Sequence, residues 1–495
     1  MSTPADLSTA ADRHEQRVLA ALIFAAATVA LVSTLGIPVI PVIAADFGVP
    51  LDDAQWILTI TLVVGAVATP VLGRLGDGAR RARVLIAAQC TVVVGCVVSA
   101  TAGSFEQMLI GRGLQGIGYA TVPLAISVAR EQLSEPLRRK GIAALSVTVA
   151  IGLGLGFPVT GALASVWNSG AAYWFGAIFS AAAVVTVRAA VPLGPRSAAR
   201  MPIDGLGVVL LSGALAALLL GVTRAGRDGW GSGLVLGLLG AAAALLTLFA
   251  LVELHERQPL VDLRLMSQRA VVGTNAAAML MAVSMYIALS LVSRVAQTPA
   301  STGYGLGASA ATAGLLLLPL SAGSFVSQPA ALAAGSRLGL RVVLPAGAMI
   351  MGITQVALGL WHGSLWALAA AIALLGIGVG STFALMPGII TASVPPERTG
   401  SAMSLHQVVR AVGGALGSAL SVTILAGHTN AGAAFPSDAG YGVAFALSFA
   451  LCAAAAAVAL VAVPPAHGAG AGRVAATHPA GDPAIVEADA GEDRR

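Results

Sequence analysis

A few polar and charged side chains stand at helical spacing inside otherwise apolar stretches of the sequence. Arg112, Gln115 and Tyr119 are three and four residues apart, so a helix places them on one face. His406 and Arg410 are four residues apart and share a helix face in the same way. A guanidinium binds several hydrogen-bond acceptors at once, and a neutral imidazole takes up a proton near neutral pH. These residues therefore predict a site within the helices that binds hydrogen-bond acceptors and takes up and releases a proton.

The composition shows what surrounds these side chains. Of the 495 residues, 57% are hydrophobic and only 10% are charged, against about 25% charged in soluble domains. Apolar runs of about 20 residues, the length of a membrane-spanning helix, recur along the chain. An arginine inside such a span costs about 2.5–3.5 kcal/mol, so Arg112 is expected to face a cavity or a partner. The alternatives are an Arg112 that snorkels to the interface and a His406 that makes ordinary hydrogen bonds there.

The apolar runs predict an all-α polytopic membrane protein, because a chain in lipid must satisfy its own backbone hydrogen bonds. Fourteen helices are expected, near 18–44, 54–72, 84–102, 106–129, 140–165, 171–191, 205–223, 233–254, 270–292, 310–331, 342–360, 365–390, 401–427 and 441–463. They predict five regions: a cytoplasmic N-terminal segment (1–17), a six-helix half (18–191), a linker with two extra helices (192–269), a second six-helix half (270–463) and a disordered cytoplasmic tail (464–495).

Basic residues are distributed unevenly between the predicted loops. Clusters occur at 74–83 and 130–140, on the side that holds both chain ends if the helices number fourteen. The opposite loops hold only Arg224, Arg227 and Arg294. Cytoplasmic loops carry the excess of Arg and Lys in membrane proteins. We therefore expect a multi-pass protein of the cell inner membrane with both termini in the cytoplasm.

Other functional classes find little support in the residue pattern. The net charge of +5 follows the loops, so no nucleic-acid binding is predicted. Cys90, Cys96 and Cys452 lie in apolar runs and are interpreted as small buried hydrophobes, and no pair of the seven His residues has metal-ligand spacing. We expect a monomer in the lipid bilayer that is not an enzyme and has no cofactor and no bound metal.

The segment from Gly73 to Leu85 joins the second and third predicted helices. It resembles the loop motif G-x-L-x-D-R-x-G-R-R-x-x-L of the major facilitator superfamily, with matches at Gly73, Leu75, Asp77, Arg81 and Leu85 and departures at Gly78, Arg80 and Ala82. A carboxylate at a helix end can accept hydrogen bonds from a facing helix N-terminus. The resemblance implies that Asp77 latches one conformation. The alternative is a basic loop that only sets topology.

Two further motifs point to the same family. The stretch 109–120, around Arg112, is similar to the drug-exporter motif of the fourth helix. The stretch 152–161 resembles the antiporter motif G-x-x-x-G-P-x-x-G-G, with matches at Gly152, Gly156 and Gly161 and with Pro158 one place late. Small residues at this spacing also occur wherever two helices pack closely, and helix packing alone is the alternative.

The resemblance covers most of the chain and indicates the fourteen-helix drug:proton antiporter family. It implies a major facilitator fold, two six-helix halves with two inserted helices, and proton-driven export of small amphipathic compounds. The first helix departs from the family because 31–38 contains no carboxylate, which leaves His406 as the deep titratable candidate. The alternatives are a facilitator or importer without proton coupling on the same fold, and a membrane sensor that transports nothing.

Overall fold

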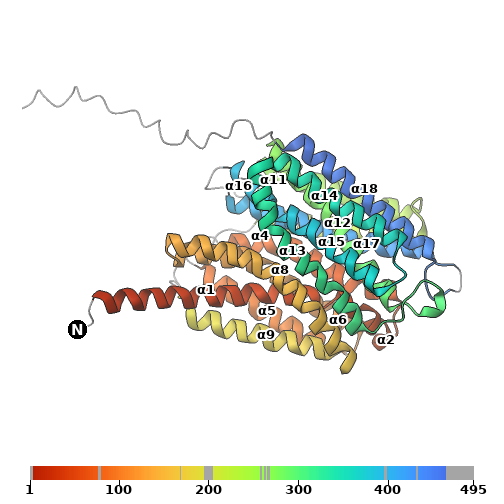
Figure 1. The fold of residues 1–495 in the computed structure, drawn as a ribbon, viewed down its shortest axis with the longest axis horizontal. Helices are drawn as coiled ribbons and strands as arrows, with labels where there is room; N and C mark the ends of the chain where they lie inside the picture. Colours follow the sequence, from red (N-terminus) through yellow and green to blue (C-terminus); the bar gives the residue numbers. More distant parts are fainter. Residues whose placement is uncertain are drawn as a thin grey trace, which may run out of the picture.

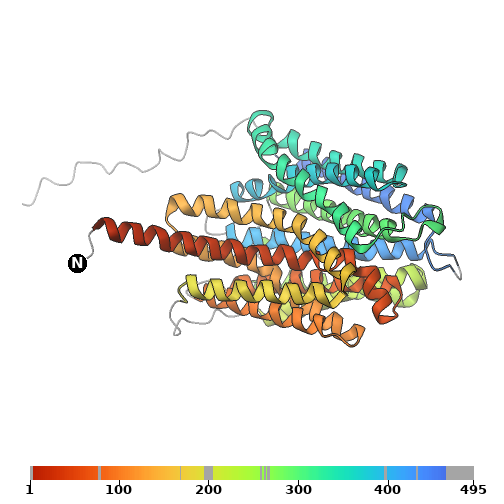
Figure 2. The same cartoon turned by 60° about the horizontal axis from the view of Figure 1, so that its bottom comes forward.

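The protein is a bundle of long helices that run roughly along one common direction (Figure 1, Figure 2). The computed structural model describes residues 4–75, 80–167, 169–193, 204–256, 259–260, 263–264, 268–394, 399–430 and 433–463. All regular elements within these ranges are helices, as the sequence predicts. Large apolar side chains such as Ile110, Val326 and Trp366 lie on the outside of the bundle and are 62%, 71% and 87% exposed. Lipid is the environment that accommodates such a surface.

The first half of the chain forms α1 to α9. Their bounds are α1 Pro4–Thr34, η1 Ile37–Val39, α2 Ile40–Phe47, α3 Leu51–Ala54, α4 Trp56–Leu75, α5 Arg81–Ala100, α6 Phe105–Gly116, η2 Ile117–Ala120, α7 Thr121–Gln132, α8 Glu135–Val166 and α9 Ser169–Ala190. Helix α1 begins earlier than the predicted 18–44. It ends before η1 and α2, each of which has a proline in its first two positions, where the missing N–H is tolerated.

The rest of the chain forms α10 to α18. Their bounds are α10 Gly205–Asp228, α11 Gly233–His255, α12 Arg269–Gln297, η4 Ala300–Thr302, α13 Ala310–Leu338, α14 Leu340–Leu360, α15 Leu365–Phe383, α16 Met386–Ala392, α17 Thr399–Ala426 and α18 Asp438–Ala462. Helix α12 is central, and most of its residues are buried. The predicted tail, 464–495, lies outside the described residues.

Twelve helices in the described part of the chain are long and apolar enough to cross a membrane. They lie in α1, α4, α5, α9, α10, α11, α12, α13, α14, α15–α16, α17 and α18. The predicted helices 106–129 and 140–165 are not among these twelve. The first is divided by the 3₁₀ turn η2 into α6 and α7, and the second corresponds to α8. The predicted total of fourteen is therefore not established by length and composition.

Two seams join the first and second halves. Helix α4 packs along α17, and α8 packs along α13. Helix α10 packs against both members of the α4–α17 seam and against α11. Helix α11 is the least buried of the twelve, and only 17% of its span is covered by protein. Helix α10 thus covers one seam, whereas the other runs between α8 and α13.

Candidate transport site

Arg112 lies on α6 and is enclosed by the first half of the bundle. Its side chain is 0% exposed. Nε donates to the Ile57 carbonyl at 3.0 Å, and Nη1 donates to the Val32 carbonyl at 3.3 Å and to Oε1 of Gln115 at 2.6 Å. The guanidinium therefore holds α1 and α4 against α6 through acceptors that are uncharged. In this conformation Arg112 does not snorkel to the interface.

Gln115 extends this network to a fourth helix, α5. Its Nε2 donates to the Gly95 carbonyl at 3.1 Å and to Oγ of Ser99 at 3.0 Å, both on α5. The guanidinium carbon of Arg112 also lies 5.9 Å from the ring centroid of Tyr173 on α9. The predicted pairing of Arg112 with Gln115 is present, while Ser99 gave no sequence signal. The arrangement makes Arg112 a fixed junction between helices of one half.

Tyr119, the third residue of the predicted face, lies in the turn η2. A Cβ added to Gly65 of α4 would be 2.9 Å from the Tyr119 ring, so the absence of a side chain at Gly65 lets the ring lie against α4. Tyr119 packs in the same apolar cluster as Tyr286 of α12. Tyr119 thus reaches the boundary between the halves, whereas Arg112 lies away from that boundary.

Arg410 of α17 lies at this same boundary. Its guanidinium carbon is 4.1 Å from the ring centroid of Phe383 on α15, a cation–π contact. Tyr286 and Tyr119 interact electrostatically with Arg410 from other helices, and His406 does so from the same helix. We call Tyr119, Tyr286, Phe383 and Arg410 the inter-half cluster. It combines a cation with three aromatic rings and draws on both halves of the protein.

His406 lies one helical turn before Arg410 and is 2% exposed. Its Nδ1 lies 2.9 Å from Oδ1 of Asn275 on α12. Since the amide oxygen can only accept, Nδ1 carries the hydrogen in this arrangement. Nε2 of His406 and Nδ2 of Asn275 have no hydrogen-bond partner among the described residues. Asn275 was missed from the sequence, although it is the only amide side chain in the apolar run of α12 before Gln297.

The glycine motif of α8 lies on the seams with α1 and α13. A Cβ on Gly161 would collide with the carbonyl oxygen of Ala310, and one on Gly156 would collide with Oγ1 of Thr34. A Cβ on Gly314 of α13 would likewise collide with the Phe157 carbonyl oxygen. Gly152 and Pro158 lie within the same helix. The motif therefore permits close packing of helices from opposite halves.

Asp77 lies outside the described residues, whereas Arg81 of the same loop motif begins α5. Nη1 of Arg81 is 3.6 Å from a carboxylate oxygen of Glu131 and 3.4 Å from the Ser127 carbonyl, both on α7. Both partners of the ion pair are partly exposed, so the pair contributes at most about 1 kcal/mol. It connects the start of α5 to the end of α7.

Polar side chains join the two halves at one end of the bundle. Nε2 of Gln55, between α3 and α4, donates to Oγ of Ser290 at 2.9 Å and to Oγ of Ser418 at 3.2 Å. Oγ1 of Thr59 and Oγ of Ser418 are 3.0 Å apart, and Oγ of Ser293 donates to the Ile37 carbonyl at 3.2 Å. These contacts were not predicted, because single Ser and Thr residues in apolar helices give no signal. They close the interface between the halves at this end.

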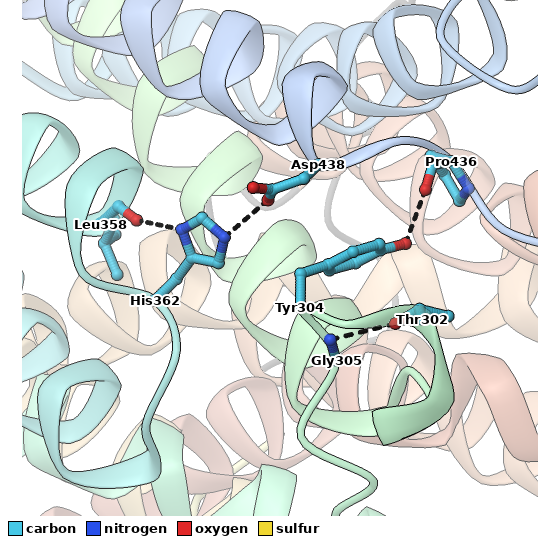
Figure 3. Close-up of polar contacts among 7 residues, drawn as sticks. All are labelled: Thr302, Tyr304, Gly305, Leu358, His362, Pro436 and Asp438. Carbon is cyan, nitrogen blue, oxygen red and sulfur yellow. Dashed lines mark hydrogen bonds and ion pairs between the residues drawn. The ribbon is translucent and has the colours of Figure 1, made fainter.

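A second polar cluster at the same end lies within the second half (Figure 3). His362 contacts the Leu358 carbonyl through Nδ1 at 2.9 Å and Asp438 through Nε2 at 2.8 Å. Tyr304 donates to the Pro436 carbonyl at 2.7 Å. Burial raises the pKa of Tyr304, so its hydroxyl keeps its proton. These bonds tie the ends of α14 and α18 and their loops together.

The sequence pattern of the Major Facilitator Superfamily matches residues 22–322 and 276–485. An uncharacterised MFS-type transporter of Mycobacterium tuberculosis is 28% identical over 417 residues, which are 81% of this chain and 58% of that protein. The chain thus spans less than two thirds of that relative. The tetracenomycin C resistance and export protein of Streptomyces glaucescens is 29% identical, over 82% of this chain and 75% of that protein. The multidrug efflux pump LfrA of Mycolicibacterium smegmatis is 26% identical over 82% and 80%.

Solved structures show the same fold at low sequence identity. A peptide transporter in complex with sulfate has a TM-score of 0.66 at 15% identity and covers 90% of this chain and 94% of its own. The POT family transporter PepTSo has a TM-score of 0.62 at 17% identity, with coverage of 91% of this chain and 97% of its own. With its helical halves, its twelve candidate spans and its drug-efflux relatives, the chain belongs to the Major Facilitator Superfamily of membrane transporters.

Proposed function

We propose that this protein is a secondary active exporter that uses protons to drive small amphipathic organic compounds out of the cell. The observation that carries the proposal is the position of the inter-half cluster. It is formed by residues of both halves, and the halves are joined at one end by the hydrogen bonds of Gln55 and Ser418. Relative movement of two halves around such a site is how transporters of repeated architecture alternate access.

The proposed topology has fourteen spans and two cytoplasmic termini. Helix α8 contains 32 residues, about 48 Å at 1.5 Å per residue, and a membrane core is about 30 Å thick. Segments α6, η2 and α7 follow one another from Phe105 to Gln132 and pack between α4 and α5. These two additional spans give the first half, 18–191, six proposed helices, the same number as the second half, 270–463. Helices α10 and α11 are inserted between the two halves. The arginine-rich loops then all face the cytoplasm.

Reporter fusions test this topology. A reporter fused after Gly468 is expected on the cytoplasmic side, and one inserted within Gly226–Gly231 on the opposite side. Signals from the same side would contradict fourteen spans. The test is independent of any substrate.

His406 is the proposed carrier of the coupling proton. Asn275 holds its Nδ1, and Nε2 is left to take up and release the proton within the bundle. Arg112 and Gln115 are proposed to keep the helices of the first half in register while this happens. The absence of a carboxylate from 31–38 favours the second candidate, a facilitator or importer without proton coupling.

Accumulation measurements separate the two candidates. Cells that express the protein are compared with a deletion strain in a screen of toxic compounds, and one exported compound is then followed with and without a proton uncoupler. A proton-coupled exporter predicts that the uncoupler raises retention in expressing cells to the level of the deletion strain. A facilitator predicts little change on adding the uncoupler.

Asp77 and Arg81 are proposed as the cytoplasmic latch of the first half. Arg81 already connects α5 to α7 through Glu131. Asp77→Asn removes a charge but keeps the side-chain shape, so transport should fall while the amount of protein in the membrane stays near normal. Normal transport in that variant would leave Asp77 as a residue that only sets topology.

A further inference from the structure

We propose that the inter-half cluster binds organic anions, and that the preferred substrates are amphipathic aromatic acids whose acidic group is held by Arg410. This inference rests on the proposed function, because it names the substrate class of the same site. Four observations support it: the orientation of the guanidinium, the charge around it, the rings beside it and the unsatisfied polar groups one turn away.

The guanidinium of Arg410 uses its face for contact with Phe383, with its central carbon 4.1 Å from the ring centroid. Stacking of this kind leaves the N–H groups at the edge of the guanidinium available. Among the described residues, Nε of Arg410 has no hydrogen-bond partner. A planar carboxylate or phenolate can accept from such an edge, through two parallel bonds in the carboxylate case.

The surrounding charge favours an anion. Helices α12 to α17 carry no Asp or Glu within their described residues. In the other helices, Glu106 lies in the first turn of α6, Glu131 in the last turn of α7 and the buried Glu253 in the last turn of α11, so all three are near helix ends. The groups that act on Arg410 from other helices are the phenols of Tyr286 and Tyr119. An anionic substrate would supply the missing opposite charge, and a cationic substrate would be repelled.

The rings beside Arg410 suit an aromatic body. Gly414, one turn after Arg410, lies against the ring of Tyr286, where an added Cβ would be 2.9 Å from the ring. Gly65 makes the same room for Tyr119 from the other half. Both rings therefore sit flush with the helix backbones at the boundary between the halves. Together with Phe383 they offer flat surfaces on which an aromatic ring can stack.

Further hydrogen-bonding capacity lies one turn away. Nε2 of His406 and Nδ2 of Asn275 belong to side chains that are 2% and 1% exposed, and neither atom has a partner among the described residues. Buried polar groups are nearly always hydrogen-bonded, so groups of this kind call for an external partner. A substrate acceptor group beside Asn275 would provide one.

Two xanthene dyes of opposite charge provide the test. Fluorescein is an anion and rhodamine 123 a cation at neutral pH, and their ring systems are alike. Binding of each dye to the purified full-length protein in detergent is measured by fluorescence anisotropy. The variants are Arg410→Gln and Arg410→Lys, and the matched control is Arg224→Gln on α10, at a partly exposed arginine far along the chain from the cluster. Thermal unfolding of each variant establishes that it is folded.

The wild-type protein is expected to bind fluorescein at least tenfold more tightly than rhodamine 123. Arg410→Gln should weaken fluorescein binding about tenfold or more, since a hydrogen-bonded charge pair is lost. Arg410→Lys keeps the charge without the planar edge, so its affinity for fluorescein should lie between those of the wild-type protein and Arg410→Gln. Arg224→Gln should bind fluorescein like the wild-type protein. Equal or tighter binding of rhodamine 123, no binding of fluorescein, or fluorescein binding that is unchanged in Arg410→Gln would each overturn the inference. Anion binding without uncoupler-sensitive export would instead remove the proposed function and leave this inference standing.

Discussion

Gln55 donates a hydrogen bond to Ser290 at 2.9 Å across the boundary between the two halves of the protein. Gln55 precedes α4 in the first half, and Ser290 lies on α12 in the second. The same amide also donates to Ser418 of α17. All three side chains are buried. These bonds join the two halves at the end of the bundle that the proposed topology places outside the cell.

Gln55→Leu should favour the conformation that is open at that end. The substitution keeps similar volume but removes two hydrogen bonds, each worth about 0.5–1.5 kcal/mol, and the populations shift accordingly. The readout is labelling of Leu62→Cys by a membrane-impermeant maleimide, with Cys90, Cys96 and Cys452 replaced by Ser. Leu62 lies on α4, is 1% exposed and packs in the apolar cluster that contains Tyr119. We expect roughly tenfold faster labelling, because a shift of about 1.4 kcal/mol in the equilibrium between the closed and open conformations changes their ratio tenfold.

The control for that experiment is Thr101→Val. Thr101 is exposed and bonds to carbonyls of its own helix α5, so its loss should leave the labelling rate unchanged. Equal labelling in Gln55→Leu and the wild-type background would show that the Gln55 contacts do not hold this end shut.

Arg112→Lys should insert and fold but lose most transport. The guanidinium donates at once to the Ile57 and Val32 carbonyls and to Gln115, and an ammonium lacks the planar fork that reaches all three. Arg112→Ala should do no better, because it removes the bonds to both carbonyls and leaves Oε1 of Gln115 buried without its donor, at a cost of about 1–3 kcal/mol. Transport normalised to the amount of membrane protein is the measurement. Arg224→Lys, at a partly exposed position, serves as the control.

Near-normal transport by Arg112→Lys would remove Arg112 from the mechanism.

Gly161→Ala should destabilise the α8–α13 seam. The added Cβ would collide with the carbonyl oxygen of Ala310, a backbone atom that cannot move alone. Overpacking of this kind costs about 1–3 kcal/mol, so the melting temperature should fall. Gly240→Ala on α11 is the matched control, since a Cβ there meets no atom within 4 Å. It should be neutral or slightly stabilising, because glycine is a poor helix former. Equal melting temperatures for the two variants would refute the close-packing role of Gly161.

His406→Gln should separate proton coupling from substrate movement. Glutamine can still hydrogen-bond to Asn275 but cannot take up a proton in the physiological range. We expect the pH dependence of transport to disappear while exchange of substrate down its gradient continues. His255→Gln, at the exposed end of α11, is the control and should keep the wild-type profile. An unchanged profile in His406→Gln would direct the search for the proton carrier to Glu131 or Asp77.

Most of the helical architecture is predictable from the sequence. Long apolar runs determine the helices because lipid offers no other partner for backbone hydrogen bonds. The exceptions are local. The turn η2 divides the predicted helix 106–129, and the prolines of η1 and α2 divide the predicted helix 18–44. Hydropathy does not detect either break in the helix, because neither the turn nor the prolines change the polarity of the segment.

The candidate site is less predictable, because it depends on which helices meet. Arg112 and Gln115 were paired correctly, since their spacing on one helix defines their contact. Asn275 and Tyr286 escaped notice because they come next to His406, Arg410 and Tyr119 only through packing of α12 against other helices. The Gln55–Ser418 contact spans 363 residues of sequence. Periodicity carries no information about contacts of that range.

The measurement closest to the central claim is transport by the purified full-length protein in proteoliposomes with an imposed pH gradient. The substrate is a compound to which expressing cells are resistant. An acidic lumen should drive accumulation above the external concentration, and a protonophore should collapse that accumulation. His406→Gln should reach only equal concentrations on the two sides. Wild-type protein that also stops at equal concentrations, whatever the pH gradient, would contradict a proton-driven exporter and establish a facilitator.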